Sequence, residues 1–165
     1  MIDLTPHLAY HIGLREGPCD DTRAAACRDS YWAVRYARDV DQGPHEDTRA
    51  AARRDPEEAY RYAWYVDRGA HDDTREAACG DPKWGYYYAV VLDSEEPITL
   101  GAIEAFSVKI VRSVGVISVG CKFHTLAEWA ARWGEIAYER KIEVSEEEAQ
   151  TLIEAATSAL EVSNE

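Results

Sequence analysis

Two histidines near the start of the chain, His7 and His11, have a spacing that suits metal chelation. They are four residues apart and would share one face of a helix, and Cys19 follows one loop later as a third soft ligand. They align, however, with Ala33 and Ala37 of a repeat that begins further along the chain. We therefore expect them to lie on or against the stacking face at the end of the array of repeats, and we predict no metal and no other cofactor.

A second pair, Cys121 and His124, has the residue types of a nucleophile and its base. The two residues stand just before a predicted helix, and a thiol near a helix N-terminus can be an activated nucleophile. The sequence offers no orienting acid and no glycine-bracketed nucleophile to accompany them. We therefore expect no catalysis, and a Cys/His-dependent enzyme is an alternative.

Side chains with ligand or charge chemistry also recur at a regular interval. Cys19, His45 and His71 hold one loop position, but equivalent positions in stacked helix pairs lie roughly 10 Å apart, too far to share one ion. We expect them to bond nearby backbone. Arginines at an equivalent helix position could bind anions, but aspartates of the same unit favour salt bridges instead. These arginines are Arg23, Arg49 and Arg75, and the aspartates include Asp29, Asp55 and Asp81.

The common interval reflects an internal repeat of 26 residues. The segment GPCDDTRAAACRD at 17–29 recurs as GPHEDTRAAARRD at 43–55 and as GAHDDTREAACGD at 69–81. A fixed period of this size is typical of stacked supersecondary units. We predict a half-repeat at 4–16 that closes the N-terminal end, followed by repeats at 17–42, 43–68 and 69–94.

Each repeat is predicted to contain two helices. The first should begin at an aspartate-threonine pair whose side chains accept hydrogen bonds from the first-turn amides. The second should begin at an aspartate, followed in two copies by Pro56 or Pro82, and should end at Gly43 or Gly69 in a left-handed conformation. The aspartate-threonine pairs are Asp21-Thr22, Asp47-Thr48 and Asp73-Thr74.

The second helix carries small and apolar residues at the i, i+3, i+4, i+7 spacing of a core-facing stripe. Small residues in such a stripe let neighbouring helices approach closely. Its members are Ala33, Tyr36, Ala37 and Val40 in the first repeat, Ala59, Tyr62, Ala63 and Val66 in the second, and Gly85, Tyr88, Ala89 and Leu92 in the third.

The composition changes near residue 95, where the acidic residues switch from mainly aspartate to glutamate alone. Residues 98–123 are rich in valine and isoleucine and predict a short sheet or hairpin, although 100–106 could form a helical turn. Two capping boxes, Thr125 to Glu128 and Ser145 to Glu148, predict the two helices that follow. Those helices should cover about 126–140 and 146–161.

The expected fold class is therefore mainly α, α+β overall. It combines a helical-repeat domain at 1–94 with a small α+β domain, a hairpin plus two helices, at 95–165.

The chain has a formal net charge of -13 and 46% hydrophobic residues. This charge repels phosphate backbones and anionic lipids and attracts basic surfaces, so we expect no direct nucleic-acid or membrane binding. No run of 18 apolar residues and no signal-peptide pattern occurs, which favours a cytoplasmic protein. The sparse, widely spaced cysteines indicate reduced thiols.

Two kinds of residue could form an interface with another protein. Tyrosine and tryptophan outnumber phenylalanine fifteen to two, and aromatic residues dominate interface hot spots. Aspartates that recur every 26 residues would form rows of negative charge along a stacked array, roughly as phosphates do. Alternatively, the aspartates are caps and solvated surface, and the rings pack against the C-terminal domain or a second copy of the chain. The predicted partner-binding residues are Asp21, Asp47, Asp73, Asp41, Asp67, Asp93, Trp32, Tyr60, Trp64 and Tyr65.

The unit DDTRAAACxDP followed by AYxYA resembles the tandem helical repeats of phage-type proteins over residues 17–93, and VGCKFHTLAEW at 119–129 is similar to a recurring element of such proteins. This resemblance implies an acidic viral inhibitor of host defence, such as an anti-CRISPR protein that acts as a DNA mimic in the host cytoplasm. We expect non-catalytic binding to a basic surface of a nucleic-acid-binding protein or complex. The alternative outside enzymes is a protein that binds or sequesters a nucleotide-like ligand.

Overall fold

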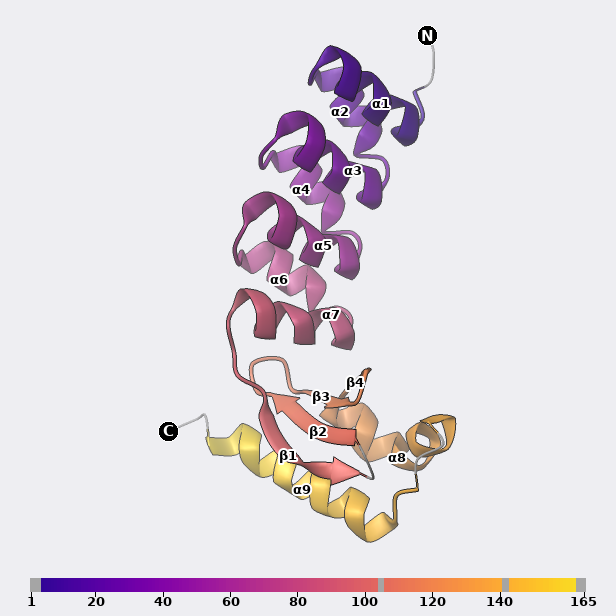
Figure 1. Ribbon diagram of the computed structural model, residues 1–165, viewed down its shortest axis with the longest axis vertical. Helices are drawn as coiled ribbons and strands as arrows, with labels where there is room; N and C mark the ends of the chain where they lie inside the picture. Colours follow the sequence, from indigo (N-terminus) through magenta and orange to yellow (C-terminus); the bar gives the residue numbers. More distant parts are fainter. Residues whose placement is uncertain (1–3, 104–105, 141–142, 163–165) are drawn as a thin grey trace. The chain divides into compact units, whose positions relative to one another are not determined.

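The computed structural model describes residues 4–103, 106–140 and 143–162 (Figure 1). These residues are mainly helical and contain one small antiparallel sheet, which confirms the predicted fold class. Contacts divide the chain into two compact units, Met1–Trp84 and Gly85–Glu165, which we call the array unit and the sheet unit. This division falls inside the third predicted repeat. The domain boundary near residue 95 rests on the change in composition and stays a prediction.

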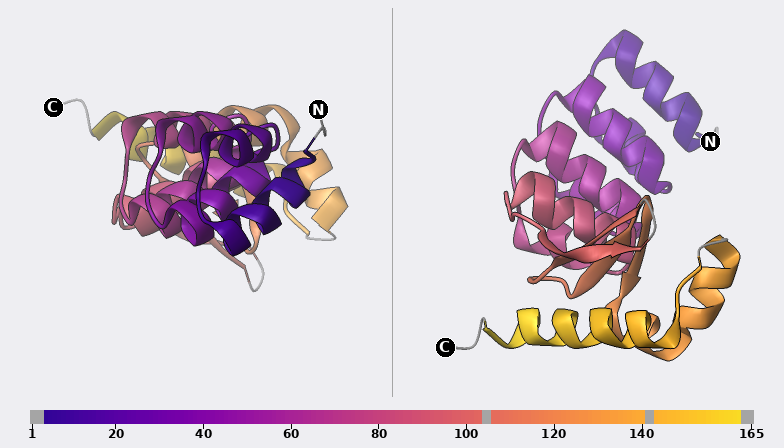
Figure 2. Two further views of the ribbon diagram at one scale, coloured as in Figure 1. Left: turned by 90° about the horizontal axis from the view of Figure 1, so that it is seen from above. Right: turned by 60° about the horizontal axis from the view of Figure 1, so that its bottom comes forward.

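The array unit consists of one single helix followed by helix pairs. Helices α1, α3 and α5 pack side by side, and α2 and α4 form the adjoining row, so that Figure 2 shows successive layers. Here η denotes a π-helical turn. The elements are α1 (Pro6–Glu16), α2 (Asp20–Ala26), α3 (Ser30–Tyr36), η1 (Ala37–Asp41), α4 (Glu46–Ala52), α5 (Pro56–Tyr62), η2 (Ala63–Asp67) and α6 (Asp72–Ala78), with α7 (Pro82–Tyr87) spanning the division.

The second helix of each pair begins where the sequence predicts. Asp29 accepts a hydrogen bond of 3.1 Å from the N–H of Trp32, and Asp55 accepts one of 3.0 Å from the N–H of Glu58. Pro56 occupies the first turn of α5, where its missing N–H leaves no intrahelical bond unmade. These caps fix the start of both helices in the array.

The first helix of each pair begins earlier than predicted, at N-cap residues Cys19, His45 and His71. The predicted caps are wrong, because the aspartate-threonine pairs lie inside the first turn. The side chain of His45 instead accepts a 3.3 Å hydrogen bond from the N–H of Asp47, so this loop histidine bonds nearby backbone as expected. The three threonines, Thr22, Thr48 and Thr74, are buried.

The second helices also end differently from the prediction. Gln42 and Arg68 have the left-handed conformation, with φ of 56° and 57°, and the glycines follow them. The reason is the wide π-helical turn: the C=O of Ala37 accepts the N–H of both Gln42 and Gly43, which closes the turn one residue before the glycine.

The core of the array unit is the predicted stripe of the second helices, tied to the first helices by tyrosine hydroxyls. Tyr36 and Tyr62 are fully buried. Each hydroxyl hydrogen-bonds a threonine of the first helix and accepts a bond from the N–H of its N-cap residue. The distances are 2.6 Å to Thr22 and 3.2 Å from Cys19 for Tyr36, and 3.0 Å to Thr48 and 3.0 Å from His45 for Tyr62.

The sheet unit contains η3 (Tyr88–Leu92) and an antiparallel meander in the order β1, β2, β3, β4. The strands are β1 (Ile98–Ile103), β2 (Phe106–Val111), β3 (Val116–Val119) and β4 (Lys122–Thr125). The sheet confirms the strand interpretation of this segment. The alternative helical turn does not form, since residues 100–103 belong to β1 and 106 to β2, while 104 and 105 lie outside the described residues.

Two helices, α8 (Leu126–Arg140) and α9 (Glu146–Glu161), follow the sheet with the predicted bounds. Both predicted capping boxes form: Thr125 with Glu128, and Ser145 with Glu148. The helices pack on each other, α8 against β3 and β4, and α9 against β1. Their shared core consists of Ile103, Val108, Ile110, Ile117, Val119, Trp129, Ile136, Leu152 and Ala156.

Candidate protein-binding surface

The arginines of the first helices are used within the repeats. Arg23 Nη2 lies 2.9 Å from Asp41 Oδ1, and Arg49 Nη2 lies 2.5 Å from Asp67 Oδ1. Only 8% of the Asp41 side chain and 1% of the Asp67 side chain is exposed, so the expected surface row at these positions is wrong. Both aspartates end a π-helical turn that brings them back over the first helix. Asp93, which follows η3, is half-buried.

The other predicted row lies in the first turns of α2, α4 and α6. Asp21 and Asp47 are exposed, whereas Asp73 accepts a 2.9 Å hydrogen bond from Arg53 of the preceding repeat. These carboxylates also suit the positive end of each helix dipole, so part of their role is structural. Together with Asp20, Glu46 and Asp72, which precede them and are exposed, we call these residues the acidic first turns.

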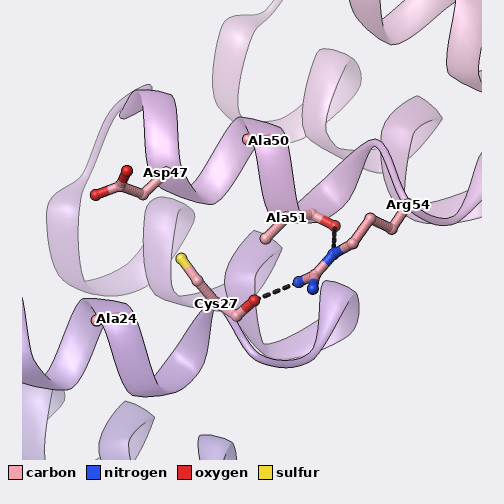
Figure 3. Close-up of a pocket in the computed structure, with 6 residues that line it drawn as sticks. All are labelled: Ala24, Cys27, Asp47, Ala50, Ala51 and Arg54. Atoms are coloured by element: carbon pink, nitrogen blue, oxygen red, sulfur yellow. Dashed lines mark hydrogen bonds between the residues drawn. The ribbon is translucent and has the colours of Figure 1, made fainter.

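A depression of about 460 Å³ lies between α2 and α4, lined by Ala24, Cys27, Asp47, Ala50, Ala51 and Arg54 (Figure 3). Burial, together with the nearby Asp47, raises the pKa of the Cys27 thiol to about 11. This thiol therefore stays protonated at neutral pH and is a poor nucleophile. Arg54 donates to the carbonyls of Cys27 and Ala51, which ties the ends of α2 and α4 together.

The histidine and cysteine pairs of the sequence analysis lie at exposed or half-buried positions. The Nε2 atoms of His7 and His11 are 2.9 Å apart, and the His7 ring packs 4.9 Å from that of Trp32. Cys121 is exposed in the turn before β4, and His124 is half-buried in that strand. Across the described ranges, no three His, Cys, Asp or Glu side chains form a group able to hold a metal ion.

Four aromatic residues are predicted to bind a partner: two of them pack within the array unit, and the other two have exposed rings. Trp32 packs against α1, and the Tyr60 ring lies 5.4 Å from that of Trp84, so both contribute to packing within the array unit. Trp64 and Tyr65, which are adjacent in η2, are 45% and 49% exposed. Of these four residues, Trp64 and Tyr65 are therefore the more exposed to a partner, while Trp32 and Tyr60 are half-buried.

Tyr65 forms one wall of a groove between α3–η1 and α5–η2, which has a volume of about 280 Å³. The opposite wall carries Tyr31, which is 40% exposed. Because α3 and α5 are neighbouring layers of one unit, buried tyrosine tethers hold both walls in place. We call this site the aromatic groove, lined by Tyr31, Val34, Arg35, Arg38, Glu58, Arg61 and Tyr65.

Guanidinium groups lie within cation–π distance of the rings of this groove. Arg35 donates a 2.5 Å hydrogen bond to the Tyr31 hydroxyl and lies 5.4 Å from the centre of that ring, while Arg38 lies 5.8 Å from the centre of the Tyr65 ring. Arg38 is also paired with Asp39 at 2.6 Å, and the hydrogen bonds from Arg38 lower the pKa of that carboxyl group. The groove thus combines aromatic surface with cation–π contacts.

A polar depression of about 300 Å³ shares the Tyr31, Glu58 and Arg61 walls of the groove. Glu58 is only 7% exposed and receives Arg61 Nη1 at 2.7 Å on its Oε1 atom. Desolvation by burial raises the pKa of Glu58, although the charge of Arg61 opposes this effect. The remaining walls of the depression are Asp29, Ser30, Asp55 and Glu57.

Sequence reasoning missed the groove residues Arg35, Arg38 and Glu58. The charges of α3 and α5 look like ordinary solvated surface, and only the stacking of adjacent layers brings them to one site. One signal was available: at the repeat position of Trp32 and Trp84, the middle copy carries Glu58 instead. A departure from an internal repeat marks a position where packing alone does not explain the residue.

Comparison of the chain with protein-family models, with curated proteins and with solved structures finds no match. None of the helices in the described part of the chain is both long and apolar enough to cross a membrane.

Proposed function

We propose that this chain is a non-catalytic protein-binding module and that its array unit supplies the binding surface. The observation that supports this most directly is the aromatic groove, with Tyr31 and Tyr65 on its two walls and Trp64 exposed beside it. Partly exposed tyrosine and tryptophan on a rigid scaffold supply large contact areas at low entropic cost, which is typical of interface hot spots.

The proposed partner presents a basic surface. The net charge of -13 and the acidic first turns favour such a surface through long-range attraction, which mainly raises the association rate. A nucleic-acid-binding protein is the partner class that most often carries a basic patch of this kind. Binding there would block nucleic acid, so inhibition of a host-defence nucleoprotein is the proposed biological role.

The acidic part of this proposal now rests on the acidic first turns. Asp41 and Asp67 cannot serve it, since their side chains are buried in ion pairs. Asp21 and Asp47 are exposed and hold equivalent positions in successive helix pairs. A mimic of the phosphate backbone would use these carboxylates, and their replacement by asparagine should leave the fold intact.

The decisive experiment captures partners on the whole 165-residue chain from a host lysate and then measures the affinity of the captured protein. The double variant Trp64→Ala, Tyr65→Ala should weaken binding by at least about 100-fold, as expected for two hot-spot residues. The matched control is Tyr138→Ala, because Tyr138 is 86% exposed in the sheet unit. Unchanged affinity in the double variant would contradict the proposed surface.

Salt and charge variants test the basic-partner claim separately. Affinity should fall steeply between low and physiological salt. The double variant Asp21→Asn, Asp47→Asn should lower the association rate constant by a larger factor than it changes the dissociation rate constant. Binding that ignores both salt and these substitutions, yet requires Trp64 and Tyr65, would make this an apolar docking module and end the mimic proposal.

A further inference from the structure

We propose that the partner anchors itself in the array unit by an arginine side chain, whose guanidinium group binds Glu58 in the polar depression against the Tyr31 ring. This inference rests on the proposed function and names the chemistry that the partner must present.

The first observation is the break in the repeat at Glu58. The other copies place Trp32 and Trp84 at this position, and Trp32 packs within the array. A tryptophan is thus compatible with the helix pair, and packing does not call for a carboxylate. The middle repeat instead buries an ionisable group, which costs free energy unless the group has a partner.

The second observation is that the Glu58 carboxylate is only half satisfied. Its Oε1 atom accepts the hydrogen bond from Arg61, while its Oε2 atom has no hydrogen-bond partner among the residues that the structure describes. The Glu58 side chain is only 9% exposed, and it lines both the aromatic groove and the polar depression. A ligand with N–H donors would complete this carboxylate.

Charge decides the sign of that ligand. The polar depression is lined by four carboxylates, Asp29, Asp55, Glu57 and Glu58, and by one guanidinium, Arg61. Arg61 is paired with both Glu57 and Glu58, and Asp29 and Asp55 are the N-cap residues of α3 and α5. The lining therefore carries four negative charges against one positive charge, which favours a cation.

Shape favours guanidinium over ammonium. The depression of about 300 Å³ has the partly exposed Tyr31 ring as one wall, and a planar guanidinium can stack on a ring while its several donors bond carboxylates. The Arg35 guanidinium already bonds the hydroxyl of this tyrosine and lies 5.4 Å from the ring centre, so the Tyr31 ring accepts a guanidinium contact within the fold itself. A lysine ammonium group would make point contacts without stacking.

The test titrates N-acetyl-arginine amide into the whole 165-residue chain and follows backbone amide signals by NMR. Signals of residues 29–31 and 55–61 should move and saturate. N-acetyl-citrulline amide, which keeps the shape but lacks the charge, should bind at least about tenfold more weakly, since hydrogen bonds between charged groups exceed neutral ones by that margin. N-acetyl-lysine amide should fall between the two.

Variants then assign the effect to one carboxylate. Glu58→Gln should weaken arginine binding at least about tenfold. Its matched control is Glu57→Gln, because Glu57 also pairs with Arg61 but is 38% exposed and should matter less than about threefold. Glu58→Trp restores the repeat pattern and should abolish the signal shifts caused by N-acetyl-arginine amide. The amide signals elsewhere in the array unit should remain those of the folded protein.

Several results would overturn the proposal. Equal shifts with citrulline, or arginine binding unchanged in Glu58→Gln, would exclude a charge contact with Glu58. Tighter binding of N-acetyl-aspartate amide or inorganic phosphate would assign the site to an anion held by Arg61. If a captured partner depends on Trp64 and Tyr65 but not on Glu58, the proposed function stands and this inference fails. If arginine binds at Glu58 and no captured partner needs the rings, the proposed function fails instead.

Discussion

The array unit buries alanines and tyrosines around hydrogen bonds and ion pairs, whereas the sheet unit buries branched aliphatic side chains around one tryptophan. In the array unit, Tyr36 and Tyr62 each reach a threonine of the preceding helix, and Asp41 and Asp67 each bury a carboxylate beside an arginine. In the sheet unit, β-branched residues and Trp129 fill one continuous apolar core.

This difference shows two solutions to the same problem. Close packing of small residues buries little apolar area per helix, so directional bonds must fix how one layer sits on the next. A sheet covered by two helices buries enough apolar surface without such bonds. The array solution has a consequence for function, because large rings that the core does not need remain at the surface, as Trp64 and Tyr65 do.

The largest expected effect is in the apolar core of the sheet unit. Replacing Trp129, which is fully buried, with alanine should lower the free energy of unfolding by about 3 to 5 kcal/mol. Urea denaturation followed by circular dichroism, together with hydrogen exchange to locate the loss in β2, β3 and α8, measures this effect. Tyr138→Ala is the control, and an equally small loss for both variants would refute the assignment of this core.

The next effect tests the buried ion pair of the array unit. Asp67→Asn should cost about 3 kcal/mol, because it leaves the Arg49 guanidinium, itself 17% exposed, without its carboxylate. Hydrogen exchange of the α4 and α5 amides should accelerate. Asp47→Asn, at a side chain that is 65% exposed, should change stability by less than about 0.5 kcal/mol. Equal effects at the two positions would mean that the pair does not hold the layer.

A smaller effect is expected for the tyrosine tethers. Tyr62→Phe keeps the ring but removes the hydroxyl that bonds Thr48 and the N–H of His45, so we expect a loss of about 1 to 2 kcal/mol. Thermal unfolding of the full chain measures it, with Tyr65→Phe as a control at an exposed ring. If the two variants melt alike, then the hydroxyl bonds add little to the alanine packing.

The smallest effect concerns the pH dependence of stability at Glu58. Burial raises the pKa of Glu58, with Asp55 and Glu57 adding to the shift and Arg61 opposing it. The folded chain therefore holds this proton at a higher pH than the unfolded chain, and ionised Glu58 lowers stability at neutral pH. Glu58→Gln should thus gain stability relative to the natural chain at pH 7, by at most about 1 kcal/mol.

This gain should shrink as the pH falls through the raised pKa toward the usual value for glutamate, since the natural side chain then becomes neutral as well. Parallel urea titrations of the two proteins between pH 4 and pH 7 measure the difference. A gain that stays constant with pH would show that Glu58 does not change its protonation on folding.

Much of the fold follows from the sequence alone, because the signals are local and repeated. The 26-residue period marks out the repeats. The aspartate caps of the second helices and the two capping boxes each act within a few residues, and both kinds of cap form. The apolar stripe also needs no knowledge of its neighbours, since helical spacing by itself puts Ala59, Tyr62 and Val66 on one face.

The site depended on tertiary structure, and so did the errors. Because of the π-helical turns, the left-handed residue is Gln42 and not Gly43, and Asp41 points inward. No local sequence pattern indicates either change. The groove joins residues of α3 and α5 that are about one repeat apart in sequence and adjacent only after the layers stack. Local propensity fixes where each helix begins, but burial of a charge or exposure of a ring depends on which layer covers it, and that is settled only when neighbouring repeats pack.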